Sequence, residues 1–193
     1  MGREFELKYA ASASQLEKLK EHYPNLQPIS METSYYDAID GALSKLRWML
    51  RRRMENGVSV CTLKTPLPDG SRGEWEVQCG SIEEGAAALC AAGAPEELLT
   101  YTAKGLQEVC AARFTRLAGI IELENCTAEL ALDEGCFLGG GRVLPFTEVE
   151  VELKDGSEEG VLTFAGQLAA EFGLKSEEKS KYRRALDLAR GDT

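Results

Sequence analysis

Charged and apolar residues alternate in several separate stretches of this chain. Residues 3–9, for example, read Arg-Glu-Phe-Glu-Leu-Lys-Tyr. Because successive side chains of a β-strand point to opposite faces, such a stretch forms a strand with one charged and one apolar face. The same pattern recurs at residues 46–55, 58–65, 72–79, 127–133 and 147–154. The chain therefore predicts an antiparallel sheet with one strongly charged face.

The charged face carries bases and carboxylates together. The bases on it are Lys8, Arg51, Arg53, Lys64 and Arg72, and the acids are Glu4, Glu6, Glu74, Glu76, Glu129, Asp133, Glu148, Glu150 and Glu152. For any one strand, the usual arrangement puts such a face in water. Repeated like charges would repel one another on a flat solvated face, however. If the sheet curls with this face inward, the bases can bind a polyanion and the carboxylates can bind hard divalent cations.

Helices between the strands can cover the apolar faces. Strands are expected over residues 3–9, 31–37, 45–55, 58–65, 73–79, 113–125, 127–133 and 143–154, and helices over 12–22, 81–111 with a break at 93–95, 158–172 and 177–190. Asn56-Gly57 is a strong hairpin signal, and Gly135 to Gly141 predicts a glycine-rich turn. Trp48 and Trp75 fall on apolar faces and are expected to pack under helices. These features predict a single α+β domain over residues 1–193.

Composition narrows the classes of function. The chain has 22 Lys and Arg against 32 Asp and Glu, a net charge of −10, so nucleic acid is not an expected partner. No apolar run approaches about 18 residues, so no membrane-spanning helix is expected. The first residues are charged where a signal peptide needs an apolar core, which favours a cytoplasmic location. The single histidine, His22, leaves no basis for a His-based triad or a His-rich metal site.

The cysteines give no sign of a metal site or a redox motif. They stand at positions 61, 79, 90, 110, 126 and 136, and no two form a CxxC pair. In a reducing compartment we expect all six to be free thiols that pack as small apolar residues.

A series of short motifs follows the strands along nearly the whole chain. They are Glu4-Phe-Glu-Leu-Lys8, Thr33-Ser-Tyr-Tyr-Asp37, Leu50-Arg-Arg-Arg53, Thr62-Leu-Lys64, Arg72-Gly-Glu-Trp-Glu76, Phe114-Thr-Arg116, Glu129-Leu-Ala-Leu-Asp133-Glu-Gly135, Glu148-Val-Glu-Val-Glu152-Leu and Ser180-Lys181-Tyr. In this order they resemble the CYTH, or triphosphate tunnel metalloenzyme, superfamily, and most of all its inorganic triphosphatase branch. The first motif alone is a weak signature, whereas the ordered series is specific. The chain departs from the family at Ala38, where Thr is frequent, and at Arg113, an additional base whose facing the sequence does not fix.

The resemblance implies a closed, eight-stranded antiparallel β-tunnel with a charged lumen and helices outside. The bases implied to bind substrate are Lys8, Arg51, Arg53, Lys64, Arg72, Arg116 and Lys181. The implied ligands of one or two Mg²⁺ or Mn²⁺ ions are Glu4, Glu6 and Glu152, with Glu74, Glu76, Glu148 and Glu150 as further candidates. Glu129 and Asp133 are candidates for orienting water and the bases. The implied catalytic set is Glu4, Glu6, Lys8, Arg53 and Glu152.

Three functions are compatible with this pattern. The favoured one is a metal-dependent hydrolase that cleaves inorganic tripolyphosphate to pyrophosphate and phosphate. An enzyme for an organic triphosphate is the alternative: a thiamine triphosphatase, a nucleoside triphosphatase or a class IV adenylate cyclase. A non-catalytic polyphosphate-binding module is the third. In each case the expected partner is a small anion, and the oligomeric state stays open. Strand parity also predicts that Arg53 points inward and Arg52 outward.

Overall fold

A computed structural model describes residues 5–67 and 72–192. Its strands are β1 (Glu6–Ala10), β2 (Gln27–Ala38), β3 (Met49–Glu55), β4 (Val58–Pro66), β5 (Arg72–Gln78), β6 (Leu106–Glu122), β7 (Cys126–Gly139), β8 (Arg142–Gly156) and β9 (Lys175–Ser176). Its helices are α1 (Ala13–His22), α2 (Ala42–Lys45), α3 (Ile82–Ala91), α4 (Glu97–Thr102), α5 (Glu158–Phe172) and α6 (Lys181–Arg190). The α+β class and the large antiparallel sheet are thus confirmed.

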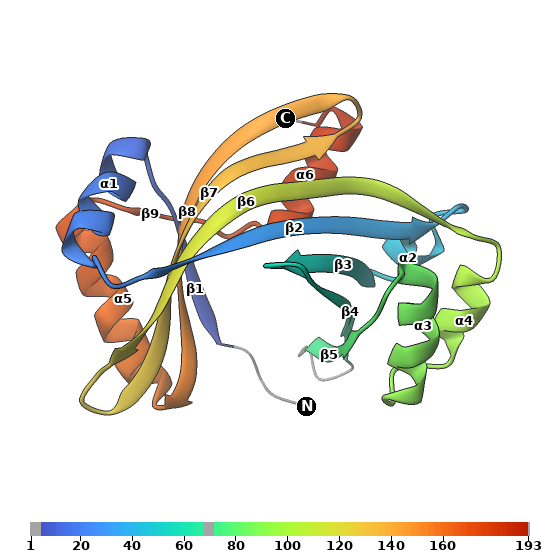
Figure 1. Ribbon diagram of the computed structural model, residues 1–193, viewed down its shortest axis with the longest axis horizontal. Coiled ribbons are helices and arrows are strands. Elements are labelled where there is room, and N and C mark those ends of the chain that lie inside the picture. Colours follow the sequence, from blue (N-terminus) through green and yellow to red (C-terminus); the bar gives the residue numbers. More distant parts are fainter. Residues whose placement is uncertain (1–4, 68–71, 193) are drawn as a thin grey trace.

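The strands form one antiparallel sheet in the order β5-β4-β3-β2-β6-β7-β8-β1-β9. Figure 1 shows β6, β7 and β8 arching over the shorter strands β3, β4 and β5. Within residues 5–67 and 72–192, no ladder joins β5 to β1 or β9. The sheet therefore curls like a tunnel wall without the closure that the resemblance implied, and the ninth strand is a two-residue addition at one edge.

The first apolar core lies on the outer face of β1, β7 and β8. Leu130, Val149 and Val151 are fully buried there, and they alternate along their strands with the charged residues of the other face. α1 and α5 cover this core through residues such as Leu16 and Leu168. The predicted placement of these two helices is confirmed. α5 has 15 residues, and in the part of the chain that the structure describes no helix is long and apolar enough to cross a membrane.

The second apolar core lies on the outer face of β3, β4 and β5, under α3 and α4. Leu50 and Leu63 are completely buried in it. Trp48 and Trp75 pack against the same cluster, and the Trp48 ring meets Tyr101 edge-to-face with 5.6 Å between centroids. Both tryptophans are therefore packing residues, as parity predicts.

α6 lies on the opposite face, which carries the charged residues and is called the inner face here. It packs against β6, β7 and β8 over Phe114, Phe137 and Phe146. Phe137 and Phe146 stack with 4.2 Å between their ring centroids. The expectation that every helix covers the outside is wrong for α6. The inner face consequently has an apolar part under α6 and a charged part beyond it.

Two predicted boundaries are wrong. Residues 106–111, expected to be helical, begin β6 and pair with β2. The expected turn at Gly135 to Gly141 is mostly strand, and only Gly140 and Gly141 form the β7–β8 turn, with φ of 58° and 73°. Gly135 lies opposite Phe114, and a Cβ there would come within 2.1 Å of the Arg113 carbonyl oxygen. Close packing of two strands, and not a turn, is therefore the reason for this glycine.

Candidate active site

Three glutamates lie side by side on the inner face of β7, β8 and β1. Glu152 of β8 is directly opposite Glu129 of β7 on one side and Glu6 of β1 on the other. These three residues are called the acidic row. Side chains that face each other across neighbouring strands are about 5 Å apart at Cβ, so like charges in such a row repel one another unless a cation lies between them.

Two lysines supply cations to the acidic row. Lys154 Nζ lies 2.9 Å from Glu152 Oε2 and 3.6 Å from Glu129 Oε1, and Lys8 Nζ lies 3.5 Å from Glu6 Oε1. Partial burial acts to lower the pKa of Lys154, but the hydrogen bond to Glu152 and the nearby Glu129 carboxylate raise it above its ordinary value. Lys154 therefore stays charged in the position between these two carboxylates.

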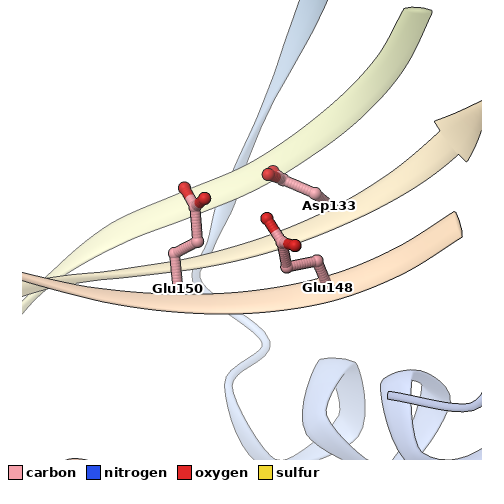
Figure 2. A group of neighbouring side chains, drawn as sticks. All are labelled: Asp133, Glu148 and Glu150. Atoms are coloured by element: carbon pink, nitrogen blue, oxygen red, sulfur yellow. The ribbon is translucent and has the colours of Figure 1, made fainter. Parts of the chain in front are cut away.

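A second group of charges lies deeper, between the acidic row and α6. Asp133 of β7 and Glu148 and Glu150 of β8 point toward one another (Figure 2), and their carboxylate oxygens lie within 4.8 Å of one another. Asp133 and Glu148 are completely buried. The cations among them are Arg116 of β6 and Lys181 and Arg184 of α6. These six residues are called the buried ion cluster.

Each carboxylate of the buried ion cluster has at least two charged contacts. Lys181 Nζ lies 2.8 Å from Asp133 Oδ2 and 2.6 Å from Glu150 Oε1, and it also contacts Glu148. Arg116 donates two hydrogen bonds of 2.8 Å to Asp133 and contacts Glu150, and Arg184 contacts Glu148. Three carboxylates and three cations thus balance formally, as a buried ionic group requires.

The pKa values of the two β8 glutamates, Glu148 and Glu150, are shifted in opposite directions. Burial raises the pKa of Glu148 to about 7, although Lys181 opposes this shift. For Glu150, burial acts in the same direction, but Lys181 and Arg116 outweigh it and lower the pKa. Burial also acts to lower the pKa of Lys181, and the three carboxylates raise it. When two carboxylates lie this close together, their pKa values commonly move apart.

The basic residues of β3, β4 and β5 form the opposite side of the inner face. Arg51 pairs in register with Thr62, and Arg53 with Val60. Lys64 Nζ lies 3.1 Å from Glu74 Oε2, and the Thr62 hydroxyl donates a 3.1 Å hydrogen bond to Glu76. We call Arg51, Arg53, Lys64 and Arg72 the basic wall, and the inner carboxylates of β1, β7 and β8 the acidic wall. Arg72 is an exposed residue at the start of β5.

Two arginines of the basic wall have unused donors. Among residues 5–67 and 72–192, neither the Nε of Arg51 nor the Nε of Arg53 has a hydrogen-bond partner, although both atoms are buried. Arg53 Nη2 lies 2.5 Å from Glu55 Oε1. Burial lowers the pKa of Arg53, and the neighbouring charges of Arg51 and Arg116 add to this while Glu55 opposes it. A buried donor without a partner is costly, so these nitrogens favour an anion.

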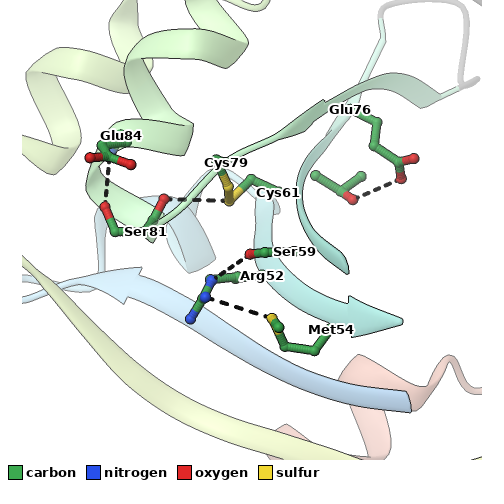
Figure 3. Close-up of a disulfide and its surroundings, with 9 residues drawn as sticks. Arg52, Met54, Ser59, Cys61, Glu76, Cys79, Ser81 and Glu84 are labelled. Atoms are coloured by element: carbon green, nitrogen blue, oxygen red, sulfur yellow. Dashed lines mark hydrogen bonds between the residues drawn. A yellow bond between two sulfur atoms is a disulfide. The ribbon is translucent and has the colours of Figure 1, made fainter. Parts of the chain in front are cut away.

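A disulfide joins β4 to the segment that follows β5. Cys61 of β4 and Cys79, which follows β5, are bonded, with 6.2 Å between their Cα atoms (Figure 3). The expectation of six free thiols is therefore wrong for this pair, because the β4–β5 register brings them together. Cys90, Cys110, Cys126 and Cys136 are free, and Cys90 and Cys136 are only half-buried.

The structure places most of the predicted residues on the inner face, with two groups apart from each other. The first group, on β1, β6, β7, β8 and α6, consists of Glu6, Lys8, Arg116, Glu129, Asp133, Glu148, Glu150, Glu152 and Lys181. The second group, on β3 to β5, consists of Arg51, Arg53, Lys64, Arg72, Glu74 and Glu76. Glu4 lies outside the described residues. Arg52 points outward, where its Nε donates a 2.8 Å hydrogen bond to Ser59 (Figure 3). Arg113 also faces away from Arg116 and donates to the Thr33 carbonyl and the Ser34 hydroxyl.

Sequence reasoning missed two inner cations. Lys154 follows Glu152 by two residues on the same strand, so parity alone places both on one face. Arg184 follows Lys181 by three residues on α6, so both lie on the same side of that helix. The spacing that applies within each motif, two residues on the strand and three on the helix, identifies Lys154 and Arg184 if it is continued beyond the last residue of the motif.

Carboxylates of the acidic wall suit a hard divalent cation. The acidic row offers oxygen ligands from three adjacent strands, the donor type that Mg²⁺ and Mn²⁺ prefer. The three carboxylates of the buried ion cluster are also close enough to hold a metal, but Lys181 Nζ lies among them. The carboxylates of the acidic wall therefore suit a divalent metal. The acidic row is the better place for it, because Lys154 beside it is more exposed than Lys181 in the buried ion cluster.

Known proteins resemble this chain in sequence. A family model described as CYTH domain matches residues 2–186. The inorganic triphosphatase of Haemophilus influenzae is 29% identical over 162 residues, which are 82% of this chain; the chain spans 46% of that protein's length.

Solved structures share the fold over almost the whole chain. A protein of Pyrococcus horikoshii is 26% identical and has a TM-score of 0.61, covering 96% of this chain and 99% of its own. A putative adenylate cyclase of Bacillus halodurans is 19% identical with a TM-score of 0.63, covering 94% and 96% respectively. A putative adenylyl cyclase from Hippeastrum, described as having a dominant triphosphatase activity, is 18% identical with a TM-score of 0.63 and covers 98% and 96%. Since the family model matches nearly every residue, the chain belongs to the CYTH domain family.

Proposed function

We propose that this chain is a metal-dependent hydrolase that cleaves inorganic triphosphate to pyrophosphate and phosphate. The observation that carries the proposal is the pairing of an acidic wall with a basic wall that holds two buried, unpartnered guanidinium nitrogens. The relationship to the inorganic triphosphatase of Haemophilus influenzae supports this substrate class. We further propose that residues 1–193 form one such domain, whose partner is a small anion and not nucleic acid.

In this proposal the basic wall binds the phosphate chain. Arg51 and Arg53 contribute their free Nε atoms, and an arginine holds phosphate oxygens through directed, charge-assisted hydrogen bonds. Lys64 adds a point charge that is already balanced by Glu74. Because phosphoryl transfer depends mainly on positioning and charge neutralisation, this wall supplies much of what the reaction needs.

The acidic row holds the metal in the same proposal. Glu6 and Glu152, with Glu4, would be its ligands, and Glu129 would orient them. When bound there, Mg²⁺ or Mn²⁺ would supply neutralisation of phosphate charge and activation of water. Water would attack the terminal phosphorus and give up a proton to solvent, while the bridging P–O bond breaks and the pyrophosphate oxygen leaves with that electron pair. The buried ion cluster keeps β7, β8 and α6 in register while this occurs.

Aromatic placement favours an inorganic substrate over an organic one. A nucleotide or thiamine ring needs an accessible aromatic or apolar surface for stacking. On the inner face, Tyr35 is 3% exposed and Phe114 is 8% exposed, because α6 packs over both. Trp48 and Trp75 lie outside under α3 and α4. The organic-triphosphate enzyme therefore remains the second candidate.

A substrate panel tests the proposal. The full chain is incubated with Mg²⁺ or Mn²⁺ and tripolyphosphate, thiamine triphosphate, ATP or long-chain polyphosphate, with release of phosphate and formation of cyclic AMP both measured. We expect tripolyphosphate to have the highest kcat/KM, no cyclic AMP, and no activity in excess chelator. A higher kcat/KM for an organic triphosphate would assign the second candidate, and binding without turnover of any of them would assign the polyphosphate-binding module.

A further inference from the structure

Lys154 occupies a place that the proposed reaction does not use. It stands two residues after Glu152 on β8 and bridges two carboxylates of adjacent strands, Glu152 at 2.9 Å and Glu129 at 3.6 Å. No motif or predicted role includes it. Its contact atom on Glu152 is Oε2, one of the two oxygens that this carboxylate could offer to a metal bound to the acidic row.

The exposure of Lys154 differs from that of the other inner lysines. Its side chain is 36% exposed, whereas the side chain of Lys181 is 11% exposed and is held by three carboxylates. A lysine stem with four carbons can swing its ammonium group into solvent while the stem stays on the sheet. Lys154 can therefore leave the acidic row at small cost, and Lys181 cannot leave the buried ion cluster.

We propose that Lys154 is a positioning residue that acts as the resident cation of the acidic row and sets its affinity for divalent metal. Without metal, the ammonium group holds Glu129 and Glu152 together against their mutual repulsion. When a metal binds Glu152, Lys154 releases that carboxylate and turns toward solvent. Metal and ammonium thus compete for one ligand, which is a negative coupling between two cations.

This inference rests on the proposed function only for the location of the metal. Competition for a carboxylate is a property of binding and requires no turnover. It predicts that loss of the Lys154 charge strengthens metal binding, whereas a residue that simply supports the fold would weaken it when removed. The two roles predict opposite changes in metal affinity, so a binding measurement distinguishes them.

The test measures Mn²⁺ affinity of the full chain without substrate, by titration calorimetry and by the electron spin resonance signal of free Mn²⁺. Lys154→Met is compared with wild type, with Lys154→Arg, and with Lys20→Met. Lys20 is a matched control, because its Nζ also bridges two carboxylates, Glu17 at 2.7 Å and Glu134 at 3.0 Å, on the outer side of the molecule. Lys154→Gln repeats the loss of charge with a polar side chain in case the methionine variant folds poorly.

We expect Lys154→Met and Lys154→Gln to bind Mn²⁺ about 5- to 50-fold more tightly, within the usual range of such couplings. Lys154→Arg and Lys20→Met should stay within about twofold of wild type. Unchanged or weaker Mn²⁺ binding by both charge-loss variants would overturn the proposal, and so would an equal gain in Lys20→Met. A chain that binds no Mn²⁺ at all would overturn it together with the metal site. The expected shift without any cleavage of tripolyphosphate would reject only the proposed activity.

Discussion

The acidic wall and the basic wall share the inner face, but they are built in opposite ways. β7 and β8 are 14 and 15 residues long, and the buried ion cluster between them and α6 balances three carboxylates with three cations. β3, β4 and β5 have only 7 to 9 residues, and two guanidinium nitrogens of their wall remain unpartnered. Every carboxylate of the buried ion cluster already has cationic partners, although among the described residues the Nε of Arg184 is also without a hydrogen bond. In the basic wall, Arg51 and Arg53 each keep a buried donor that a bound anion can use.

This difference separates residues that hold the fold from residues that hold a ligand. Substitution in the buried ion cluster should first affect the free energy of unfolding. Substitution in the basic wall or the acidic row should first affect binding or turnover.

Lys181→Met should destabilise the fold more than any other single change considered. It would leave Asp133, Glu148 and Glu150 without their shared ammonium group in a buried place. Removing one partner from a buried ionic group costs about 3–5 kcal/mol of unfolding free energy, which urea denaturation measures. Lys179→Met is the control, because Lys179 is 60% exposed and pairs with Asp187 at 3.0 Å. Its loss should cost no more than about 1 kcal/mol. Equal losses for both lysines would show that the buried ion cluster does not hold the fold.

Glu6→Gln should lower kcat by at least about 100-fold with little change in stability, because metal stabilisation of the transition state is worth several kcal/mol. Equilibrium binding of tripolyphosphate should persist, since the basic wall is intact. Glu17→Gln, on the outer side of the molecule, removes a carboxylate without touching the row and should behave as wild type. Wild-type turnover by Glu6→Gln would remove the acidic row from the mechanism.

Reduction of the Cys61–Cys79 bond should destabilise the basic wall. The bond closes a loop with a sequence separation of 18, and a cross-link of that span contributes roughly 3 kcal/mol to the unfolding free energy. Thermal unfolding with and without dithiothreitol measures the effect. The double variant Cys61→Ser, Cys79→Ser should not respond to the reductant, and a response as large as that of wild type would assign the effect to another cysteine.

Arg53→Ala should raise KM by about 10- to 150-fold, because a charge-assisted contact to phosphate is worth about 1.5–3 kcal/mol. Its effect on the unfolding free energy should be small. Arg52→Ala should leave steady-state kinetics unchanged, because Arg52 points outward to Ser59. If the two neighbours proved equally damaging, the inward register of β3 would be shifted by one residue.

Much of the fold could be predicted from the sequence because a strand has a period of two. The contrast between Glu148 and Val149 on β8 already separates an inner from an outer face. Segments 106–111 and 135–139 could not be assigned in this way. The first is rich in residues that favour helices, and pairing with β2 overrides that preference. In the second, Gly135 indicates a turn by composition, but the structure uses it for close contact with Phe114.

The candidate site was less predictable than the sheet, and for a different reason. Strand parity indicates which residues share a face, but it does not indicate which face α6 covers. The positions of Lys181 and Arg184 among the carboxylates of β7 and β8 depend on that docking. The bond between Cys61 and Cys79 likewise depends on the register of β4 with β5, in which Cys61 lies opposite Val77, and strand parity does not fix that register.

The register of β1 with β8 has a consequence for how the protein is made. Glu6 leaves the ribosome long before its partner Glu152, because β2 to β7 lie between them in the sequence. Until then β1 has no neighbouring strand on that side, and closing so long a loop is entropically slow. The acidic row is therefore among the last parts of the molecule to assemble. A nascent or truncated chain that ends before β8 can form neither this row nor the buried ion cluster, because both include residues of β8.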